Sequence, residues 1–303
     1  MSTLASLRDN EDNNAITVVV TDSSVDAAAL NTLSDKTSVA IGATGITAIT
    51  GTTAATLIAY AATLITGLAN ETITLSDAAT AANLITLDGE TTGIITATAS
   101  QGTVTDLKSI VDANSNNAIT ITTTDSGATA AELNTIDGIT SVAVNASSIT
   151  GIESGTAASA NTAYASSGIT GLGNETVIVS DTSVAASVMN TLDGNTTGAV
   201  NGASINTVTG TATAAVTLYQ SSGVTGLTAE AVTLSGTATT AQLATLDGET
   251  TGVITATAGD GDMSSLASLA DANDNNAITI TVTDSSVAAA ALNTLDGKTT
   301  VAI

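Results

Sequence analysis

Five residue types are missing from this chain of 303 residues: tryptophan, phenylalanine, histidine, cysteine and proline. Without cysteine there is neither a disulfide nor a thiolate metal site. Without histidine and cysteine no nucleophile–base constellation can be named, so we expect no enzymatic activity. The lack of proline is consistent with strands whose backbone N–H groups donate to neighbouring strands.

Aromatic side chains are nearly absent as well, with only Tyr60, Tyr164 and Tyr219. Apolar residues nevertheless make up 43% of the chain, which is too many for wholesale disorder. A thick globular core usually uses aromatic rings to fill its volume. A core of Ala, Val, Ile, Leu and Thr therefore predicts a thin core that is uniform along the chain. The three tyrosines occupy matching places in the repeat described below, which favours structural packing over ligand stacking.

Basic residues are scarce too: Arg8, Lys36, Lys108 and Lys298 stand against 28 acidic residues, for a formal net charge of −24. Such a charge repels phosphate, so we expect no nucleic-acid partner. No uninterrupted apolar run approaches the length that spans a membrane, so we expect no membrane insertion. The first residues show no Sec signal peptide. We therefore expect a segment of a longer repeat protein, or a chain whose export signal is removed or C-terminal.

What the chain does contain is a repeat at a fixed interval of 159 residues. Asp112–Gly138 (DANSNNAITITTTDSGATAAELNTIDG) recurs as Asp271–Gly297 (DANDNNAITITVTDSSVAAAALNTLDG). Thr72–Ala99 recurs in the same way as Ala231–Ala258. A sequence that copies itself in register is typical of stacked units.

A shorter period lies inside the long one, marked by the motif [LM]-x-T-[LI]. The motif ends at Leu33, Leu87, Ile136, Leu192, Leu246 and Leu295. Three of the intervals between these residues complete one long repeat, and each interval holds two smaller units. The mean unit is about 26 residues long, a length typical of leucine-rich-type solenoids.

Each unit reads as a strand followed by a short helix. Ala277–Thr283 and Ala118–Thr124 alternate apolar residues with threonine, as half-buried strands do. Asp and Ser resemble helix caps ahead of most motifs, at Asp22, Asp77, Asp125, Asp181 and Asp284. Weaker helices are predicted over 53–60, 156–164 and 211–219.

These patterns predict an α/β repeat solenoid resembling leucine-rich repeats. Residues 1–303 would form one continuous solenoid of about eleven coils, with an incomplete second copy of the long repeat. The strands would form one parallel β-sheet with short helices over one face. The alternative is an all-β right-handed β-solenoid. Four consecutive alanines at 288–291 favour the helical version because alanine is a good helix former and a poor strand former.

Calcium is the one candidate ligand. Three segments share the pattern D-x-[NE]-x-N: Asp9, Glu11 and Asn13; Asp112, Asn114 and Asn116; Asp271, Asn273 and Asn275. Alternating oxygen side chains suit a hard cation that takes six or more oxygens. The segments lack the sixth-position glycine and the distal glutamate of an EF-hand loop. The missing ligands favour the alternative, an Asp/Asn-rich turn held by local side-chain-to-backbone bonds.

Two blocks, Ala163–Gly198 and Asn276–Ile303, resemble tandem repeats of very large acidic proteins from marine bacteria, notably picocyanobacteria. The resemblance covers essentially the whole chain and implies an exported protein of a surface layer, fibre or adhesin. It is a resemblance of repeat style, so no functional residue is carried over.

We therefore expect a non-enzymatic structural protein, located outside the cell or at its surface. It would be a repeat segment of a filament, surface layer or stalk, and its partner would be itself, in a head-to-tail homopolymer or in a longer parent chain. The alternative is an adhesin or fibre-type rod that recognises glycans or surfaces, and in one form of this alternative calcium stiffens the rod.

Overall fold

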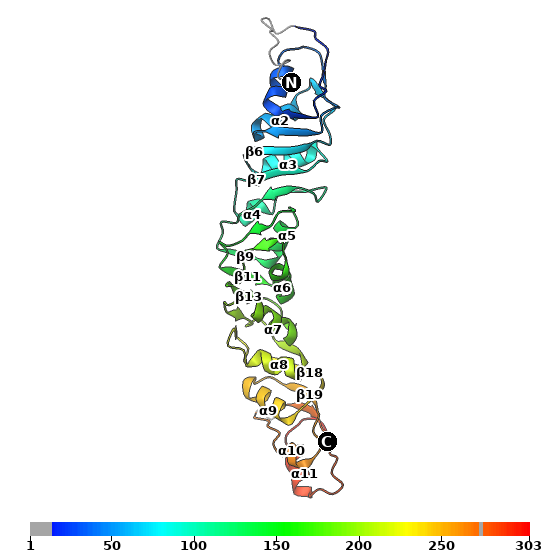
Figure 1. Cartoon of the computed structure of the whole chain (residues 1–303). Coiled ribbons are helices and arrows are strands. Elements are labelled where there is room, and N and C mark those ends of the chain that lie inside the picture. Colours follow the sequence, from blue (N-terminus) through cyan, green and yellow to red (C-terminus); the bar gives the residue numbers. More distant parts are fainter. Residues whose placement is uncertain (1–13, 273–274) are drawn as a thin grey trace. The chain divides into compact units, whose positions relative to one another are not determined.

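The computed structural model describes residues 14–272 and 275–303, and within them the chain is an α/β protein with eleven helices (Figure 1). The helices are α1 Ala27–Ser34, α2 Thr53–Ala61, α3 Ala81–Glu90, α4 Val104–Leu107, α5 Ala130–Asp137, α6 Ala157–Ala165, α7 Ala186–Asn195, α8 Ala212–Tyr219, α9 Thr240–Glu249, α10 Met263–Leu266 and α11 Ala289–Asp296. The α/β class expected from the sequence is confirmed, and the all-β alternative fits less well.

The chain divides into two compact units. The first comprises Met1–Ser126, Glu132–Ile149 and Ser166–Gly171, and the second comprises Gly127–Ala131, Thr150–Ala165 and Leu172–Ile303. Every strand pairing in the described residues is parallel. Parallel pairing requires a crossover between successive strands, and the short helices supply part of it.

The first unit holds three sheets, in the strand orders β1-β3-β5, β2-β4-β6-β7-β8 and β10-β12. Their strands are β1 Val18–Val19, β2 Ser24–Asp26, β3 Ile41–Gly42, β4 Ala48–Gly51, β5 Ile65–Thr66, β6 Thr72–Ala79, β7 Ile95–Ala99, β8 Ala118–Thr120, β10 Val144–Asn145 and β12 Ile169–Thr170. The isoleucines of the long sheet stand in register, with Ile49 opposite Ile73 and Ile73 opposite Ile95. All three are buried and belong to the core.

The second unit holds two five-stranded sheets, in the orders β9-β11-β13-β15-β17 and β14-β16-β18-β19-β20. Their strands are β9 Gly127–Thr129, β11 Gly151–Gly155, β13 Thr176–Val179, β14 Ser183–Ala185, β15 Val200–Asn201, β16 Thr207–Thr211, β17 Val224–Thr225, β18 Ala231–Ala238, β19 Ile254–Ala258 and β20 Ala277–Thr279. In this unit each of α6, α7 and α8 packs against the next helix along the chain.

The expectation of one parallel sheet is therefore wrong, because the described residues form five separate sheets. The reason is a corner that recurs between consecutive strands. Strands β3 and β4 are consecutive, yet the chain turns between them at 43–47, and they join different sheets. The corner is held by the Ile46 amide, which donates to the Ala43 carbonyl, and by burial of both side chains.

The 159-residue repeat of the sequence is also a repeat of the structure. Strand β2 and helix α1 in the first copy correspond to β14 and α7 in the second, at an offset of 159 residues. The sheets that contain β2 and β14 correspond strand by strand. Repeated α/β elements with parallel sheets thus follow the period that the sequence displays.

The recurring motif marks the inner face of the helices. Its last residue is fully buried in the first five occurrences, and Leu295 in the sixth is 3% exposed. In α1 the buried residues are Ala27, Leu30 and Leu33, which is the spacing of a single helical face. The weaker helices and the alanine-rich helix are confirmed as α2, α6, α8 and α11.

The helix starts differ from the expectation. Asp22, Asp125 and Asp181 precede short strands, and the next helix begins only after the strand. Where the described structure shows a capping side chain, it is mostly a threonine, as with Thr52 of α2 and Thr239 of α9. Within the described residues no helix is both long and apolar enough to cross a membrane.

Candidate functional site

Five aspartates each accept a hydrogen bond from the first amide of the preceding helix. The Thr53 amide at the start of α2 donates to Asp77 Oδ1 at 2.7 Å, and the Thr53 hydroxyl donates to the same oxygen at 2.8 Å. The same contact joins Val104 to Asp125, Ala157 to Asp181, Thr240 to Asp260 and Met263 to Asp284. We call these five carboxylates the bridging aspartates.

A bridging aspartate is a helix cap supplied from the next repeat. The first amides of a helix lack intrahelical partners and carry partial positive charge, so a carboxylate there is favourable. The bonds from Thr53 hold the pKa of Asp77 below its usual value. Four of the aspartates predicted as caps, Asp77, Asp125, Asp181 and Asp284, do bind a helix start, but that helix precedes them and the bonded amide lies 21 to 24 residues earlier. The fifth bridging aspartate, Asp260, was not predicted.

A second recurring cluster joins a buried glutamate to a tyrosine. The hydroxyls of Tyr60, Tyr164 and Tyr219 donate to Glu71, Glu175 and Glu230 at 3.1, 2.8 and 3.4 Å. Burial is the largest cause that raises the pKa of each tyrosine, and the neighbouring glutamate raises it further. The tyrosines thus serve contacts inside the chain, in agreement with the packing interpretation.

The glutamates of this cluster are almost completely enclosed. Glu71 and Glu175 are fully buried, and Glu71 accepts a bond from the Ala69 amide at 2.9 Å. Glu175 accepts one from the Gly173 amide at 2.8 Å. Sequence reasoning missed these residues because glutamate is rarely buried. The available signal was the fixed spacing of eleven residues from tyrosine to glutamate, which occurs three times.

A threonine four residues beyond each motif forms a third contact between repeats. Its hydroxyl donates to a main-chain carbonyl of the preceding repeat, as from Thr37 to Ile16, from Thr140 to Ile119 and from Thr299 to Ile278, at 2.7–2.8 Å. Thr91, Thr196 and Thr250 donate in the same way to the carbonyls of the three buried glutamates. The constant spacing from motif to threonine was visible in the sequence. The carbonyl that the threonine binds could be identified only from the structure.

The Asp/Asn-rich turns are built around an asparagine that follows the sequence pattern. Asn117 is 1% exposed; its side-chain nitrogen donates to Asp88 at 2.9 Å, and its side-chain oxygen accepts from the Ile95 amide at 2.8 Å. The Asn117 amide donates to Asp112 Oδ2 at 2.8 Å, which closes the turn. Asn276 repeats both side-chain bonds with Asp247 and Ile254.

The candidate calcium ligands fall into three groups. Asp9, Glu11, Asn13 and Asn273 lie outside the described residues. In the turn of the first copy, Asp112 Oδ1 and Asn116 Oδ1 are buried and have no hydrogen-bond partner, whereas Asn114 is exposed. In the second copy Asn275 Oδ1 is likewise unpartnered, but Asp271 accepts from the Asn275 amide at 3.2 Å.

Two unpartnered oxygens in one turn match the hard-oxygen chemistry of calcium, although water would have to complete the shell. The amide oxygens alone are not specific: Asn31 in α1 also donates its side-chain nitrogen to a neighbouring repeat and leaves its oxygen buried without a partner. The specific group is the carboxylate of Asp112. Among the residues that the structure describes, no three His, Cys, Asp or Glu side chains gather as a metal cluster.

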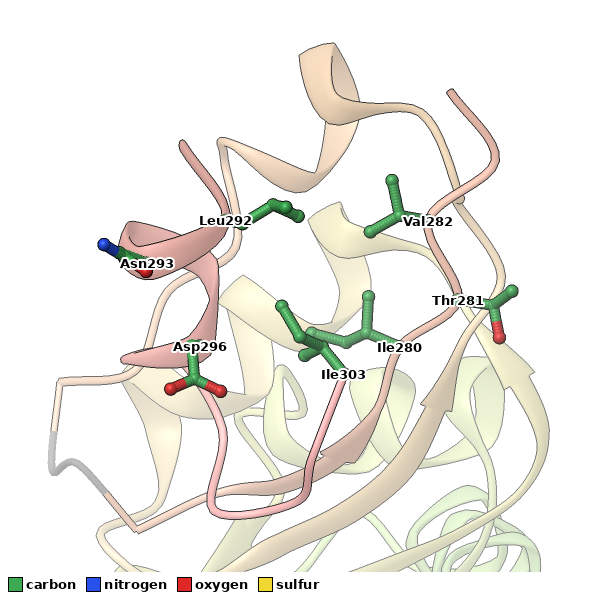
Figure 2. A pocket seen from close by; sticks show the side chains of 7 residues that line it. All are labelled: Ile280, Thr281, Val282, Leu292, Asn293, Asp296 and Ile303. Carbon is green, nitrogen blue, oxygen red and sulfur yellow. The ribbon is translucent and has the colours of Figure 1, made fainter. Parts of the chain in front are cut away.

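An open pocket of about 570 Å³ lies where the described chain ends, in the second unit (Figure 2). Ile280 and Ile303 lie close together in it, and Leu292 and Asp296 extend from α11 at its side. Its lining is apolar apart from Thr281, Asn293 and Asp296. The pocket holds no pair of groups suited to acid–base chemistry.

Comparison with known proteins assigns nothing to this chain. No family model, no curated protein and no solved structure matches it. Its function therefore has to be inferred from how its own residues are arranged.

Proposed function

We propose that this chain is a non-enzymatic structural protein, a solenoid segment of an extracellular filament, surface layer or stalk. Each coil would be one strand–corner–strand–helix unit of about 26 residues, comparable to a leucine-rich repeat. Coils would continue along one axis, in a longer parent chain or through head-to-tail contact between copies. The bridging aspartates carry this proposal, since they tie the N-terminal ends of five helices, α2, α4, α6, α9 and α10, to the following coil.

Such contacts suit a mechanical role. When each coil completes the hydrogen bonds of its neighbour, stability is close to a sum of nearest-neighbour terms, and length is gained without a new core. A net charge of −24 keeps the surfaces of neighbouring chains apart. A recognition role for the tyrosines has less support, because all three hydroxyls are bonded to buried glutamates.

Electron microscopy of the native material tests this proposal. We expect elongated particles or filaments, and labelling of intact cells with an antibody against the chain should stain their surface. Compact, round particles of single chains would contradict the structural role. Staining that appears only after cells are opened would contradict the location.

Calcium binding at the Asp112 turn is a second candidate function, favoured by the two unpartnered buried oxygens of Asp112 and Asn116. Calorimetry of the whole chain with calcium and then with chelator should show a higher melting temperature with calcium. Asp112→Asn should reduce the difference because it removes the charged ligand. Asp35→Asn, which removes an exposed charge on another turn, is the matched control and should leave the difference unchanged. Equal melting temperatures in the parent chain would remove the calcium hypothesis.

A further inference from the structure

The pocket at the end of the chain repeats a surface that is covered elsewhere. We call Ile280, Val282, Leu292, Asp296 and Ile303 the C-terminal face. The residues 159 positions earlier are Ile121, Thr123, Leu133, Asp137 and Val144. Ile121, Leu133 and Val144 are at most 1% exposed, whereas Leu292 is partly exposed and Ile303 is 41% exposed.

Backbone hydrogen bonds close the earlier surface. The Asn145 amide donates to the Ile121 carbonyl, and the Thr123 amide donates to the Asn145 carbonyl, both at 2.9 Å. Val144 then pairs in parallel with Ile169 of the following repeat. At the C-terminal face no hydrogen bond within the described residues uses the Ile280 carbonyl or the Val282 amide.

A third occurrence near the start of the described chain is closed in the same manner. The Val20 amide donates to the Gly42 carbonyl at 2.8 Å, and Ile41 pairs in parallel with Ile65. Val20 is 1% exposed and Ile41 is fully buried. Two covered examples therefore define what the uncovered one lacks: one more strand in parallel register and an apolar residue behind it.

The residue at the end of a helix determines which kind of coil can pack next to it. Asp137 accepts a bond from the Ser166 hydroxyl at 2.7 Å, and Asp193 accepts one from the Ser221 hydroxyl at 2.6 Å. Two residues after each serine comes a glycine, and a Cβ atom added to either glycine would collide with the aspartate carboxylate. A Ser-x-Gly turn thus supplies both a donor and the space that the carboxylate occupies.

The third covered example lacks both the aspartate and the Ser-x-Gly turn, which indicates that the two occur together. There the helix ends in Ser34 where the others have aspartate, and the following coil carries Ala62-Thr63-Leu64 where they have Ser-Ser-Gly. Asp296 occupies the aspartate position of the last helix and lines the pocket. Its carboxylate lies beside the apolar pocket in Figure 2.

We infer that the C-terminal face is a docking surface for one further coil that carries a Ser-x-Gly turn, of the class represented by residues 145–171 of this chain. The coil would give a carbonyl to the Val282 amide and an amide to the Ile280 carbonyl. Its serine hydroxyl would donate to Asp296, and its glycine would leave room for that carboxylate. This inference rests on the proposed solenoid, and it adds a selection rule for which coil follows.

The test is to extend the full chain after Ile303 with a copy of residues 145–171 and to measure hydrogen exchange of the Val282 amide. We expect exchange to slow by at least about tenfold, since the amide gains a hydrogen bond and loses contact with water. The control extension carries Ser166→Ala and Gly168→Ala within the added copy. It should give clearly weaker protection.

A second experiment exchanges the helix-end residue and the added coil. It tests the pairing of aspartate with a Ser-x-Gly turn even if one extension folds poorly. Each of the two extensions, residues 145–171 and residues 42–67, would be added to the parent chain and to the Asp296→Ser variant. Residues 42–67 form the coil that comes after the Ser34 helix in the native chain. Protection of Val282 should be greater in the two matched combinations, aspartate with Ser-x-Gly and serine with residues 42–67, than in the two mismatched ones. Equal protection in all four would overturn the rule.

One further outcome would overturn the proposed occupant. If the Val282 amide of the unextended chain is protected in a concentration-dependent way, a second copy of the chain covers this face as it stands. Electron microscopy of native material reports on filament assembly independently of these extensions, so failure of the proposed function and failure of the docking rule are distinguishable.

Discussion

Residues 118–144 and 277–303 have nearly the same sequence in two different surroundings. In the first segment Ala130 and Leu133 are fully buried, and residues 127–129 form strand β9, which pairs with β11. In the second, Ala289 is exposed, Leu292 is partly exposed, and residues 286–288 form no strand. The comparison teaches that a repeat of this chain is completed by the repeat that follows it. Burial and strand pairing here are properties of neighbours.

The largest expected effect is a difference between equivalent leucines. Leu133→Ala should lower the free energy of unfolding by about 3 kcal/mol, because it opens a cavity in a covered core. Leu292→Ala should cost less than about 1 kcal/mol, since part of that side chain is already in water. Urea denaturation of both variants measures the two values. Equal losses would mean that the C-terminal face is covered in solution.

The buried glutamates provide a comparison in which the two copies should agree. Glu71→Ala and Glu230→Ala each leave a loop amide and a tyrosine hydroxyl without their acceptor, and each should cost about 2 kcal/mol. Tyr60→Phe, the milder control, removes only one donor and should cost about 1 kcal/mol. Glu71 and Glu230 belong to different compact units, and urea denaturation of each variant measures the two losses. If Glu230→Ala lowers the free energy of unfolding much less than Glu71→Ala does, the two clusters are not equivalent.

Alkaline titration tests the same tyrosine–glutamate clusters by ionising their tyrosines. The pKa of Tyr60 and of Tyr219 is raised in the folded chain, so the neutral form is favoured there. The corresponding stability is complete below about pH 10, where unfolded tyrosine titrates, and is lost as pH rises above that value. Tyrosinate absorbance should therefore appear only together with loss of the folded circular dichroism spectrum. Reversible ionisation near pH 10 in the folded chain would contradict this.

The smallest expected effect is a difference in acid stability between the two copies of the long repeat. The cap of α10 is Asp262, whose pKa the bonds from Ser264 and Ser265 lower to about 2, whereas the equivalent cap of α4 is Thr103. A lowered pKa contributes stability that is present above about pH 4 and is lost as pH falls toward the folded value. The urea midpoint of the chain should fall over this range, and Asp262→Thr should make the fall smaller. An unchanged slope in the variant would show that this cap does not contribute.

Much of the fold could be predicted because it depends on local patterns. The motif that ends at Leu33 places apolar residues on one helical face, and the last residue of the motif is buried in all six occurrences. The helix predicted over 53–60 is found at Thr53–Ala61, whereas the strand predicted over Ala118–Thr124 is shorter, at Ala118–Thr120. The candidate metal turns were harder. Asp112 and Asn116 carry the pattern, yet the most deeply buried residue of the turn is the adjacent Asn117.

The sequence by itself determined the period, the secondary structure type and the residues of the core, since each follows from spacing within one repeat. Only the tertiary structure decided that β3 and β4 enter different sheets, that Asp77 caps the helix of the preceding repeat, and that Glu71 is enclosed. The physical reason is distance along the chain. A hydrogen bond between residues some 24 positions apart leaves no periodic signature until the repeats are placed side by side.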